Sequence, residues 1–165
     1  MKELNAAPLT AEAFAPFGEV ISVEAATRHF PINNGVTERY HDLARLDAGA
    51  DGRLIVSIAR SQPYAPPVTI AMMERHPLGT QAFIPLSGEP FLLVVARPGP
   101  APTVDDLFAF LAGPDQGVNY AAGTWHHPLL ALNRVSDFLI LDRSGTGSNC
   151  DEATLDAQAI IRHLA

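Results

Sequence analysis

Residues 82–96 read Ala82-Phe-Ile-Pro-Leu86-Ser87-Gly-Glu-Pro90-Phe91-Leu-Leu-Val-Val-Ala96, and this stretch decides the fold class. Two apolar runs of strand length, Ala82–Leu86 and Phe91–Ala96, flank four residues of turn type. A short apolar run bounded by Gly or Pro is typical of a buried β-strand. The intervening Ser-Gly-Glu-Pro is a hairpin signal, because Gly and Pro adopt the backbone angles that tight turns need. We therefore expect two buried strands here.

Similar apolar runs recur on both sides of this stretch. The 14 prolines of the chain punctuate them, and frequent proline suits short strands joined by turns because proline breaks helices and donates no ladder hydrogen bond. Many short strands within residues 1–165 predict one all-β domain, either a barrel or a sandwich. Further strands are expected at Glu19–Val23, Leu54–Ala59, Val68–Met73 and Phe138–Asp142.

A few short helices are expected to flank these strands. The first is a single turn that Thr10 caps and Pro16 stops. The second follows Thr103 and covers Val104–Leu111. The third covers Glu152–His163, where apolar residues recur at a helical spacing.

Composition excludes several classes of partner. The formal net charge of −7 leaves no basic surplus for a nucleic acid or an anionic membrane surface. The apolar runs are too short for a membrane span, and the N-terminus has no signal-peptide core. The single cysteine, Cys150, forms no internal disulfide, as expected in a reducing compartment. We therefore expect a cytoplasmic protein.

Residues Thr27–Asp51 are polar and show little periodicity. A segment of this length without regular structure is uncommon in a compact domain unless it has a function. We expect it to form an arm that serves a site or an interface.

Chemically capable side chains gather in Glu74-Arg75-His76-Pro-Leu-Gly-Thr-Gln81. Strand residues alternate between faces, so Glu74 and His76 point the same way and Arg75 points the other way. After the turn, Gln81 can return on the neighbouring strand toward the same interior, and His126 can join from a later segment. Imidazole, carboxylate and amide groups together suit a divalent ion such as Ni, Mn, Fe or Zn.

The spacing resembles the two motifs of the cupin superfamily. Its first motif has His-x-His, three or four residues, Glu, six residues and Gly, and Glu74-x-His76, Gln81 and Gly88 stand at the same spacing. Its second motif contains Gly-x-x-His, as in Gly123-Thr-Trp-His126. The resemblance implies a cupin-like β-barrel of the jelly-roll type. The chain departs from the pattern because Glu replaces the first His, Gln replaces Glu, Leu130 stands where an Asn is usual, and the opening Gly of the first motif is missing. The four metal-holding positions of cupins correspond to Glu74, His76, Gln81 and His126.

Longer segments are similar to those of ureidoglycolate lyases, nearly end to end. They are Asn33-Asn-Gly, Glu38-Arg-Tyr-His41, residues 74–88, Gln116-Gly-Val-Asn-Tyr, Gly123-Thr-Trp-His-His-Pro-Leu, Asp142-Arg and Asn149-Cys-Asp-Glu. The resemblance implies a lyase that cleaves the C–N bond of ureidoglycolate to glyoxylate and urea, in allantoin degradation. This cleavage needs a general base, a general acid and a cationic clamp for the carboxylate. A divalent metal, Ni or similar, would act as Lewis acid and template, and no organic cofactor is implied.

Residue roles follow from the resemblance and from side-chain chemistry. His76 and His126 are the leading catalytic and metal-binding candidates, with Glu74 and Gln81 completing the set or serving as base and orienting amide. His127 is the fifth catalytic candidate: it is expected to face away from His126, and it becomes a proton carrier only if a bend before Pro128 turns it inward. The substrate-binding candidates are Arg39, Asn34 and Trp125, and the candidates for the carboxylate clamp are Arg39, His41, Arg75 and Arg97.

Ordinary structural roles remain open for several of these residues. Glu74 can pair with an arginine, Gln81 can satisfy a strand backbone group, and Trp125 can pack at the barrel mouth. Asn34 can belong to a simple turn. Cys150 is expected to be a small buried hydrophobe. Surface positions are expected for His29, His41 and His163.

Two rival functions stay open. A hydrolase acting on the same substrate would release ammonia and carbon dioxide, and a non-catalytic cupin would bind a small acid without turnover. The expected partner is the small-molecule substrate, with no nucleic acid and no membrane. The arm and the edge strands of such a barrel also predict a homodimer.

Overall fold

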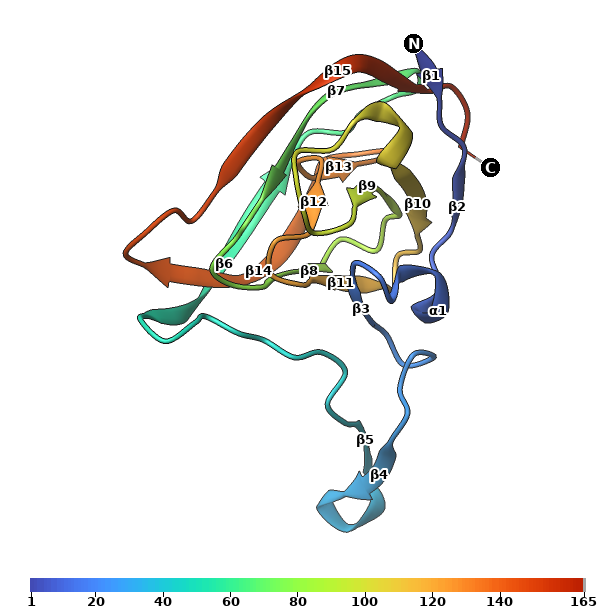
Figure 1. Ribbon diagram of the computed structural model, residues 1–165. Coiled ribbons are helices and arrows are strands. Elements are labelled where there is room, and N and C mark those ends of the chain that lie inside the picture. The colour runs from blue at the N-terminus through green and yellow to red at the C-terminus, as the bar shows by residue number, and fades with distance from the viewer. Residues whose placement is uncertain (165) are drawn as a thin grey trace.

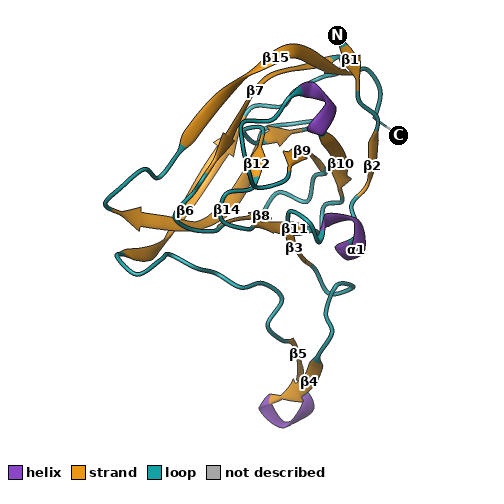
Figure 2. Ribbon diagram, in the orientation of Figure 1, coloured by secondary structure: helices purple, strands orange, loops and turns teal. Residues whose placement is uncertain are grey.

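The computed structural model describes residues 1–164, and almost all of their regular structure is β-strand (Figures 1 and 2). This confirms the all-β prediction. The first sheet runs in the order β1 (Lys2–Glu3), β15 (Asp151–Ile161), β7 (Val68–Arg75), β12 (Trp125–His126), β9 (Phe91–Ala96), β10 (Phe108–Ala112) and β2 (Ala6–Pro8), with β13 (Leu130–Ala131) also paired to β9. The second sheet runs β3 (Gly18–Ile21), β11 (Gly117–Tyr120), β8 (Gln81–Pro85), β14 (Ser136–Gly145) and β6 (Gly52–Ser61).

The two sheets curl around a shared core (Figure 1). Strand β9 is buried along its whole length, so its side chains alternate between two apolar clusters. Phe91, Leu93 and Val95 join residues of the second sheet in the cluster between the sheets. The alternate residues of β9 enter a cluster on the other side of the first sheet, beneath β15. This double burial accounts for the continuous apolar run that the sequence shows at β9.

The turn Ser87–Pro90 does not close a hairpin. Strand β8 pairs with β11 and β14 in the second sheet, whereas β9 pairs with β10, β12 and β13 in the first. The predicted strands are therefore present, but the turn carries the chain from one sheet to the other. The turn at Pro77–Gly79 does the same between β7 and β8.

Two predicted helices are wrong. Residues Val104–Asp106 form only a 3₁₀ turn, η2, and the chain then enters strand β10. The terminal segment forms β15 instead of a helix, because β7 pairs along one of its sides and β1 along the other. A register shift between Thr154 and Ala159 places apolar residues at a spacing that imitates a helix. Long-range pairing here overrides the local signal.

The expected helix caps are confirmed. Thr10 caps α1 (Ala11–Phe14) by accepting from the Ala13 backbone N–H at 3.2 Å. Thr103 and Asp106 form a reciprocal capping box around η2. Such caps typically contribute about 1 kcal/mol each. No helix within residues 1–164 combines the length and apolar character that crossing a bilayer requires.

The predicted arm projects from the barrel as a hairpin (Figure 1). Its strands β4 (His29–Ile32) and β5 (Thr37–Tyr40) pair only with each other and are joined by η1 (Asn33–Gly35). The returning chain is tied to the barrel where the Asp47 N–H donates to Thr80 Oγ1 at 2.9 Å and the Arg45 N–H donates to Glu19 Oε1 at 3.1 Å. The arm is thus anchored at its base and free at its tip.

Candidate active site

His126 lies between the two sheets with 1% of its surface exposed. Its backbone pairs with Glu74 on β7 and Val95 on β9, which turns the ring into the barrel. The Nδ1 atom lies 3.1 Å from the carbonyl oxygen of Thr124. A ring nitrogen facing a carbonyl is the one that carries the proton, so Nε2 carries the lone pair.

The His126 Nε2 atom faces the Glu74 carboxylate. Nε2 and Oε1 lie 3.4 Å apart, and no residue from 1 to 164 offers Nε2 a well-aligned hydrogen bond. Burial lowers the pKa of His126 and keeps the ring neutral. The contact with His126 lowers the pKa of Glu74 and keeps the carboxyl ionised. A lone pair and a carboxylate therefore face each other, and a cation between them would satisfy both.

Tyr120 holds the His126 ring from the opposite sheet. The two rings stack with centroids 4.2 Å apart and planes inclined by 8°. Burial raises the pKa of the Tyr120 phenol, so this group stays protonated. Sequence reasoning missed this residue, although Tyr120 lies within one of the segments that resemble the ureidoglycolate lyases. No local pattern signals a ring stack between strands of different sheets.

His76 is held at both ring nitrogens by oxygen atoms. Nδ1 lies 2.7 Å from the Asn149 carbonyl oxygen, and Nε2 lies 2.9 Å from Gln81 Oε1. The Gln81 amide has this orientation because its Nε2 donates to Asp142 Oδ2 at 3.1 Å. An oxygen atom therefore faces each ring nitrogen of His76, so either nitrogen can donate when it carries a proton. Asp142 is the second residue that sequence reasoning missed.

The residues present fit a divalent metal ion. Glu74, His76 and His126 each offer a ligand atom, and these atoms lie within 4.8 Å of one another. The buried and unpartnered Nε2 of His126 opposite a carboxylate is the arrangement that a cation completes. His76 would act as a ligand through a ring nitrogen that carries no proton, because a metal binds the lone pair of a neutral imidazole.

A cavity of about 170 Å³ opens beside His76. Asp142, Arg143 and Asn149 form part of its wall, together with Leu78, Gly79 and Cys150. Cys150 is exposed, so its expected burial is wrong. Its Sγ lies 3.9 Å from Glu74 Oε2. Partial burial and the negative charges of Glu74, Glu152 and Asp151 raise the pKa of the thiol, which makes it a poor thiolate.

Arg75 and Trp125 lie on the face of the first sheet that points away from His126. Arg75 donates to Asp151 Oδ2 at 2.9 Å and to the Gly99 carbonyl at 2.8 Å. Its guanidinium carbon lies 4.7 Å from the centre of the Trp125 ring, which is buried in the outer cluster. The alternation expected for residues 74–76 is confirmed. Trp125 therefore packs in the apolar core, which is the structural role that the sequence left open beside substrate binding.

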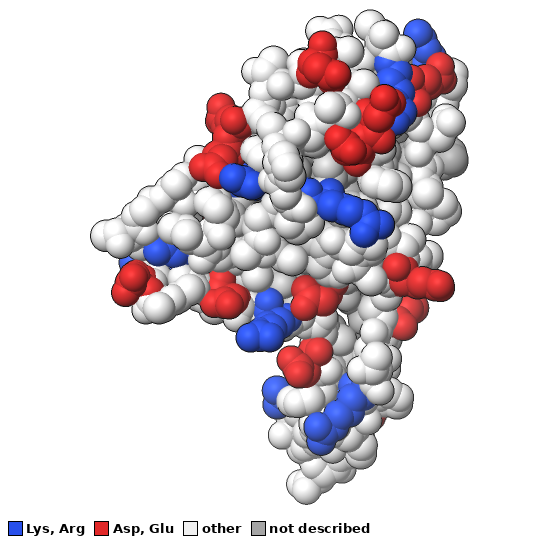
Figure 3. Space-filling view, viewed as in Figure 1, with Lys and Arg blue, Asp and Glu red and all other residues white. Residues whose placement is uncertain are grey.

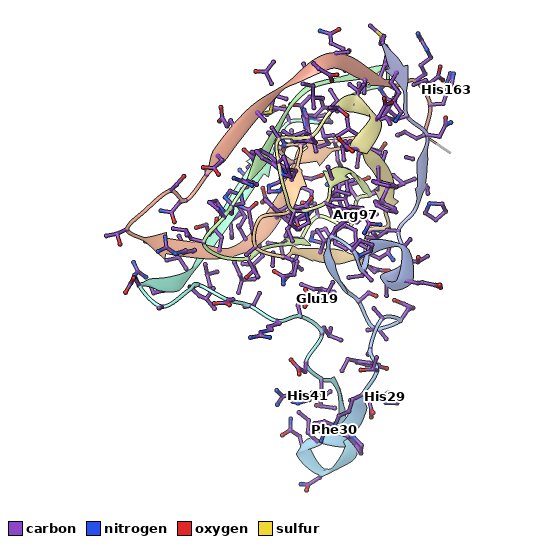
Figure 4. All side chains as sticks on the ribbon, in the orientation of Figure 1. Glu19, His29, Phe30, His41, Arg97 and His163 are labelled. Carbon is purple, nitrogen blue, oxygen red and sulfur yellow. The ribbon has the colours of Figure 1, made fainter. Side chains whose placement is uncertain are left out.

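The arm carries its predicted binding residues away from this cavity within one chain. Figure 4 shows His41 beside Phe30 on the projecting hairpin, whereas Arg97 lies on the barrel. Arg39 is exposed on β5, and Asn34 is exposed within η1 in a left-handed conformation at φ 56°. Arg97 lines a separate hollow beside the proline-rich loop 98–102. None of these four residues lines the cavity beside His76.

His127 follows His126 but makes no direct bond to the other candidates in the described part of the chain. Its Nδ1 lies 2.8 Å from the Pro128 carbonyl oxygen, and its backbone N–H donates to Val94. Burial lowers the pKa of His127. The residue remains close enough to Glu74 for that carboxylate to oppose this shift.

Charged side chains of both signs are interspersed on the surface that Figure 3 draws, without a continuous basic area. The salt bridges of the described residues include Arg60 with Asp137 and Arg134 with Glu89.

Comparison with known proteins identifies close sequence relatives. The sequence model of the family described as Ureidoglycolate lyase matches residues 1–162. A protein named Ureidoglycolate lyase from Burkholderia cepacia is 59% identical over 149 residues, which cover 90% of this chain and 84% of that protein. Proteins of the same name from Brucella abortus and Pseudomonas syringae pv. tomato are 56% and 53% identical, each covering 92% of this chain and 89% of the relative.

Two solved structures are more distant. A dTDP sugar isomerase from Desulfovibrio desulfuricans superimposes with a TM-score of 0.49 at 16% identity, covering 86% of this chain and 88% of the other. RmlC from Streptococcus suis, in complex with dTDP-D-xylose, gives a TM-score of 0.43 at 11% identity, with coverage of 87% and 74%.

Proposed function

This chain belongs to the ureidoglycolate lyase family, and from that premise we propose that it cleaves ureidoglycolate to glyoxylate and urea between the two sheets of its barrel. The family match bears out the resemblance predicted from the sequence motifs. The observation that carries the site assignment is the unpartnered Nε2 of His126, buried opposite Glu74. An unpaired, fully buried nitrogen is costly to maintain, and a substrate proton or a cation would satisfy it.

His126 is the proposed general base. Its neutral ring carries a lone pair on Nε2, because Nδ1–H points at Thr124. This lone pair takes the proton of the substrate hydroxyl, and the oxygen then forms the aldehyde C=O as the C–N bond breaks. Glu74 stabilises the imidazolium that results, at 3.4 Å. Tyr120 keeps the ring plane fixed during the transfer.

His76 is the proposed general acid. The electron pair of the broken C–N bond moves to the ureido nitrogen, which must gain a proton to leave as urea. The His76 ring supplies this proton from Nε2, the atom that faces Gln81. The ring centroids of His76 and His126 lie 5.1 Å apart; His76 lines the cavity and His126 is buried next to it, so the substrate must reach past the cavity wall to contact His126 in the proposed reaction. The base ends with one proton more and the acid with one fewer, and exchange with water restores both.

A divalent ion held by Glu74, His76 and His126, with Gln81 as a fourth ligand, would polarise the hydroxyl and carboxylate oxygens when bound, and it would take over the activation of the hydroxyl from His126, whose Nε2 lone pair it would occupy. These nitrogen and oxygen ligands suit Ni²⁺ or a similar borderline ion. The ion does not need to change its oxidation state, because the cleavage is not a redox reaction.

The direct test measures products. The purified chain with ureidoglycolate should form urea and glyoxylate in equal amounts and little ammonia. The His126→Gln variant should lose at least about a hundredfold in kcat, the usual contribution of a general base. The matched control His163→Gln removes an exposed histidine near the C-terminus and should retain wild-type activity. Ammonia as the main nitrogen product would favour the hydrolase, and tight binding without turnover would favour a non-catalytic acid-binding cupin.

We also propose that the chain forms a homodimer in which the arm of one copy lies against β6 of the other. Strand β6 is the edge of the second sheet and pairs only with β14. Leu54, Val56 and Ile58 point to one face of β6 and are 41%, 66% and 64% exposed. Exposed apolar side chains on a ten-residue edge strand are a site for association. The hairpin offers an apolar counterpart at Val36, which is 84% exposed.

The proposed setting is the cytoplasm, in the degradation of allantoin. The free and exposed Cys150 suits a reducing compartment. The proposed reaction releases urea, from which a later hydrolysis can recover nitrogen.

A further inference from the structure

One cationic side chain lines the cavity beside His76. Among the described residues around this cavity, Arg143 is the single lysine or arginine. The wall also carries the Asp142 carboxylate, and Glu74 lies behind Cys150. An anionic substrate that enters here meets like charges, so its binding requires a compensating cation.

Arg143 has no acidic partner in residues 1–164. Its Nε donates to the Ala48 carbonyl at 2.9 Å, and Nη2 donates to the Thr146 carbonyl at 2.8 Å. Nη1 donates to the side-chain oxygen of Asn149. These three acceptors are neutral, and they use three of the five N–H groups of a guanidinium. The charge is therefore uncompensated, and two N–H groups have no acceptor in the described chain.

Glycines make room for this side chain. A Cβ at Gly52 would lie 2.7 Å from Arg143 Nε, and one at Gly145 would lie 2.9 Å from Nη2. A Cβ at Gly79 would lie 2.9 Å from the Arg143 Cβ. A Cβ would also meet a backbone oxygen at each position: that of Ala48 at Gly52, that of Asp47, 2.9 Å away, at Gly79, and that of Asp51, 2.9 Å away, at Gly145. Backbone and glycines therefore pack closely around the arginine. A guanidinium that is already ordered loses less entropy when it binds a ligand.

We propose that Arg143 binds the carboxylate group of the substrate, which deepens the function proposed above and rests on it. A guanidinium matches the two oxygens of a carboxylate through a pair of N–H groups. Asn149 links this position to the proposed acid, because its side-chain oxygen accepts from Arg143 and its carbonyl oxygen accepts from His76. A carboxylate on Arg143 is thereby held next to His76.

The cationic residues that the sequence predicted for this clamp either bond another residue or lie in another part of the molecule. Arg75 bonds Asp151 on the opposite face of the sheet. Arg39 and His41 lie on the arm, and Arg97 lines a different hollow. Within one chain, the structure therefore replaces these four candidates with Arg143.

The test compares two inhibitors that differ only in charge, glyoxylate and its neutral amide glyoxylamide. Their inhibition constants are measured for the wild type and for Arg143→Gln, Arg143→Lys, Asn149→Ala and Arg53→Gln. Asn149→Ala removes one anchor of the Arg143 side chain and keeps its charge. Arg53→Gln removes an exposed arginine of β6 whose partner in the strand pairing, Ser144, is the neighbour of Arg143.

The wild type should bind glyoxylate roughly ten- to hundredfold more tightly than glyoxylamide, as expected for charge-assisted hydrogen bonds. Arg143→Gln should bring this ratio close to one, and Arg143→Lys should retain part of it. Arg53→Gln should keep the wild-type ratio, and Asn149→Ala, which frees one anchor of the Arg143 side chain, should lower it in part. An unchanged ratio in Arg143→Gln overturns the proposal. If that variant does not fold, an unchanged ratio in Arg143→Lys overturns it equally.

This experiment also separates the proposal from the proposed function. Calorimetric titration with the two compounds measures binding without turnover. A chain that does not cleave ureidoglycolate, yet prefers glyoxylate in an Arg143-dependent manner, would refute the lyase function and retain the carboxylate site. A chain that cleaves ureidoglycolate but shows the same glyoxylate-to-glyoxylamide ratio in every variant would retain the lyase function and refute the carboxylate site.

Discussion

The side-chain amide of Gln81 donates from Nε2 to Asp142 Oδ2 at 3.1 Å, and this bond turns Gln81 Oε1 toward His76. One carboxylate thus decides which end of an amide faces the proposed acid. If the amide were reversed, its NH₂ group would face His76 Nε2 and would require that nitrogen to be unprotonated. Asp142 therefore decides whether an oxygen or an NH₂ group faces His76 Nε2.

Asp142→Asn should lower kcat by roughly tenfold or more, because a neutral partner no longer selects the orientation of the Gln81 amide. Steady-state kinetics with ureidoglycolate check this. The control Asp137→Asn changes the same residue type on the same strand, where Asp137 pairs with the exposed Arg60, and should leave kcat unchanged. Wild-type kcat in Asp142→Asn would refute the orienting role.

Removal of divalent ions should abolish most of the activity, and Ni²⁺ or a similar ion should restore it. Added metal should also raise the Tm of the stripped chain, since a ligand that binds only the folded state stabilises it. Glu74→Gln should reduce this shift because it removes a charged ligand from the group formed with His76 and His126. Full activity after treatment with a chelator would exclude a catalytic metal.

Stability should fall as the pH decreases through the ordinary pKa of histidine. Burial lowers the pKa of His126 below its usual 6.5 in the folded chain. The unfolded chain then binds more protons than the folded one below that pH, so the contribution of the neutral ring is present above it and is lost toward acid. Urea unfolding of the metal-free chain at about pH 7.5 and about pH 5.5 measures the effect.

The matched variant in this experiment is His126→Gln, whose side chain does not titrate. The difference in unfolding free energy between the wild type and this variant should become smaller at the lower pH. Burial also lowers the pKa of His127, but that residue is present in both proteins. A difference that does not vary with pH would contradict the buried, neutral state of His126.

The double variant Val56→Asp, Ile58→Asp should be monomeric in light scattering, because two charges on the exposed face of β6 would be buried in the proposed dimer. Val135→Asp provides the control. Val135 is also exposed, at 41%, but lies in the turn before β14 and away from that face. An unchanged dimer in the double variant, or a monomeric wild type, would refute the proposed interface.

Local patterns predicted the strands and much of the site. The two-residue alternation separates Glu74 and His76 from Arg75, and the structure shows that separation. Motif spacing singled out Gln81 and His126 as well, which the structure brings next to His76 and Glu74. Periodicity failed in residues 151–161, where apolar residues at a helical spacing lie in a strand with a register shift. Pairing with β7 and β1 decides that segment, and such pairing is not encoded locally.

The sequence by itself determined the all-β class, the family resemblance and the residue types that meet in the barrel, because strand alternation and motif spacing act over a few residues. Only the tertiary structure decided which strands belong to which sheet, and hence that Tyr120 stacks on His126 and Asp142 orients Gln81. It also favours Arg143 as the proposed carboxylate clamp over the four candidates expected from the sequence, Arg39, His41, Arg75 and Arg97. These relationships join residues tens of positions apart, and their geometry arises when two sheets close over a common core.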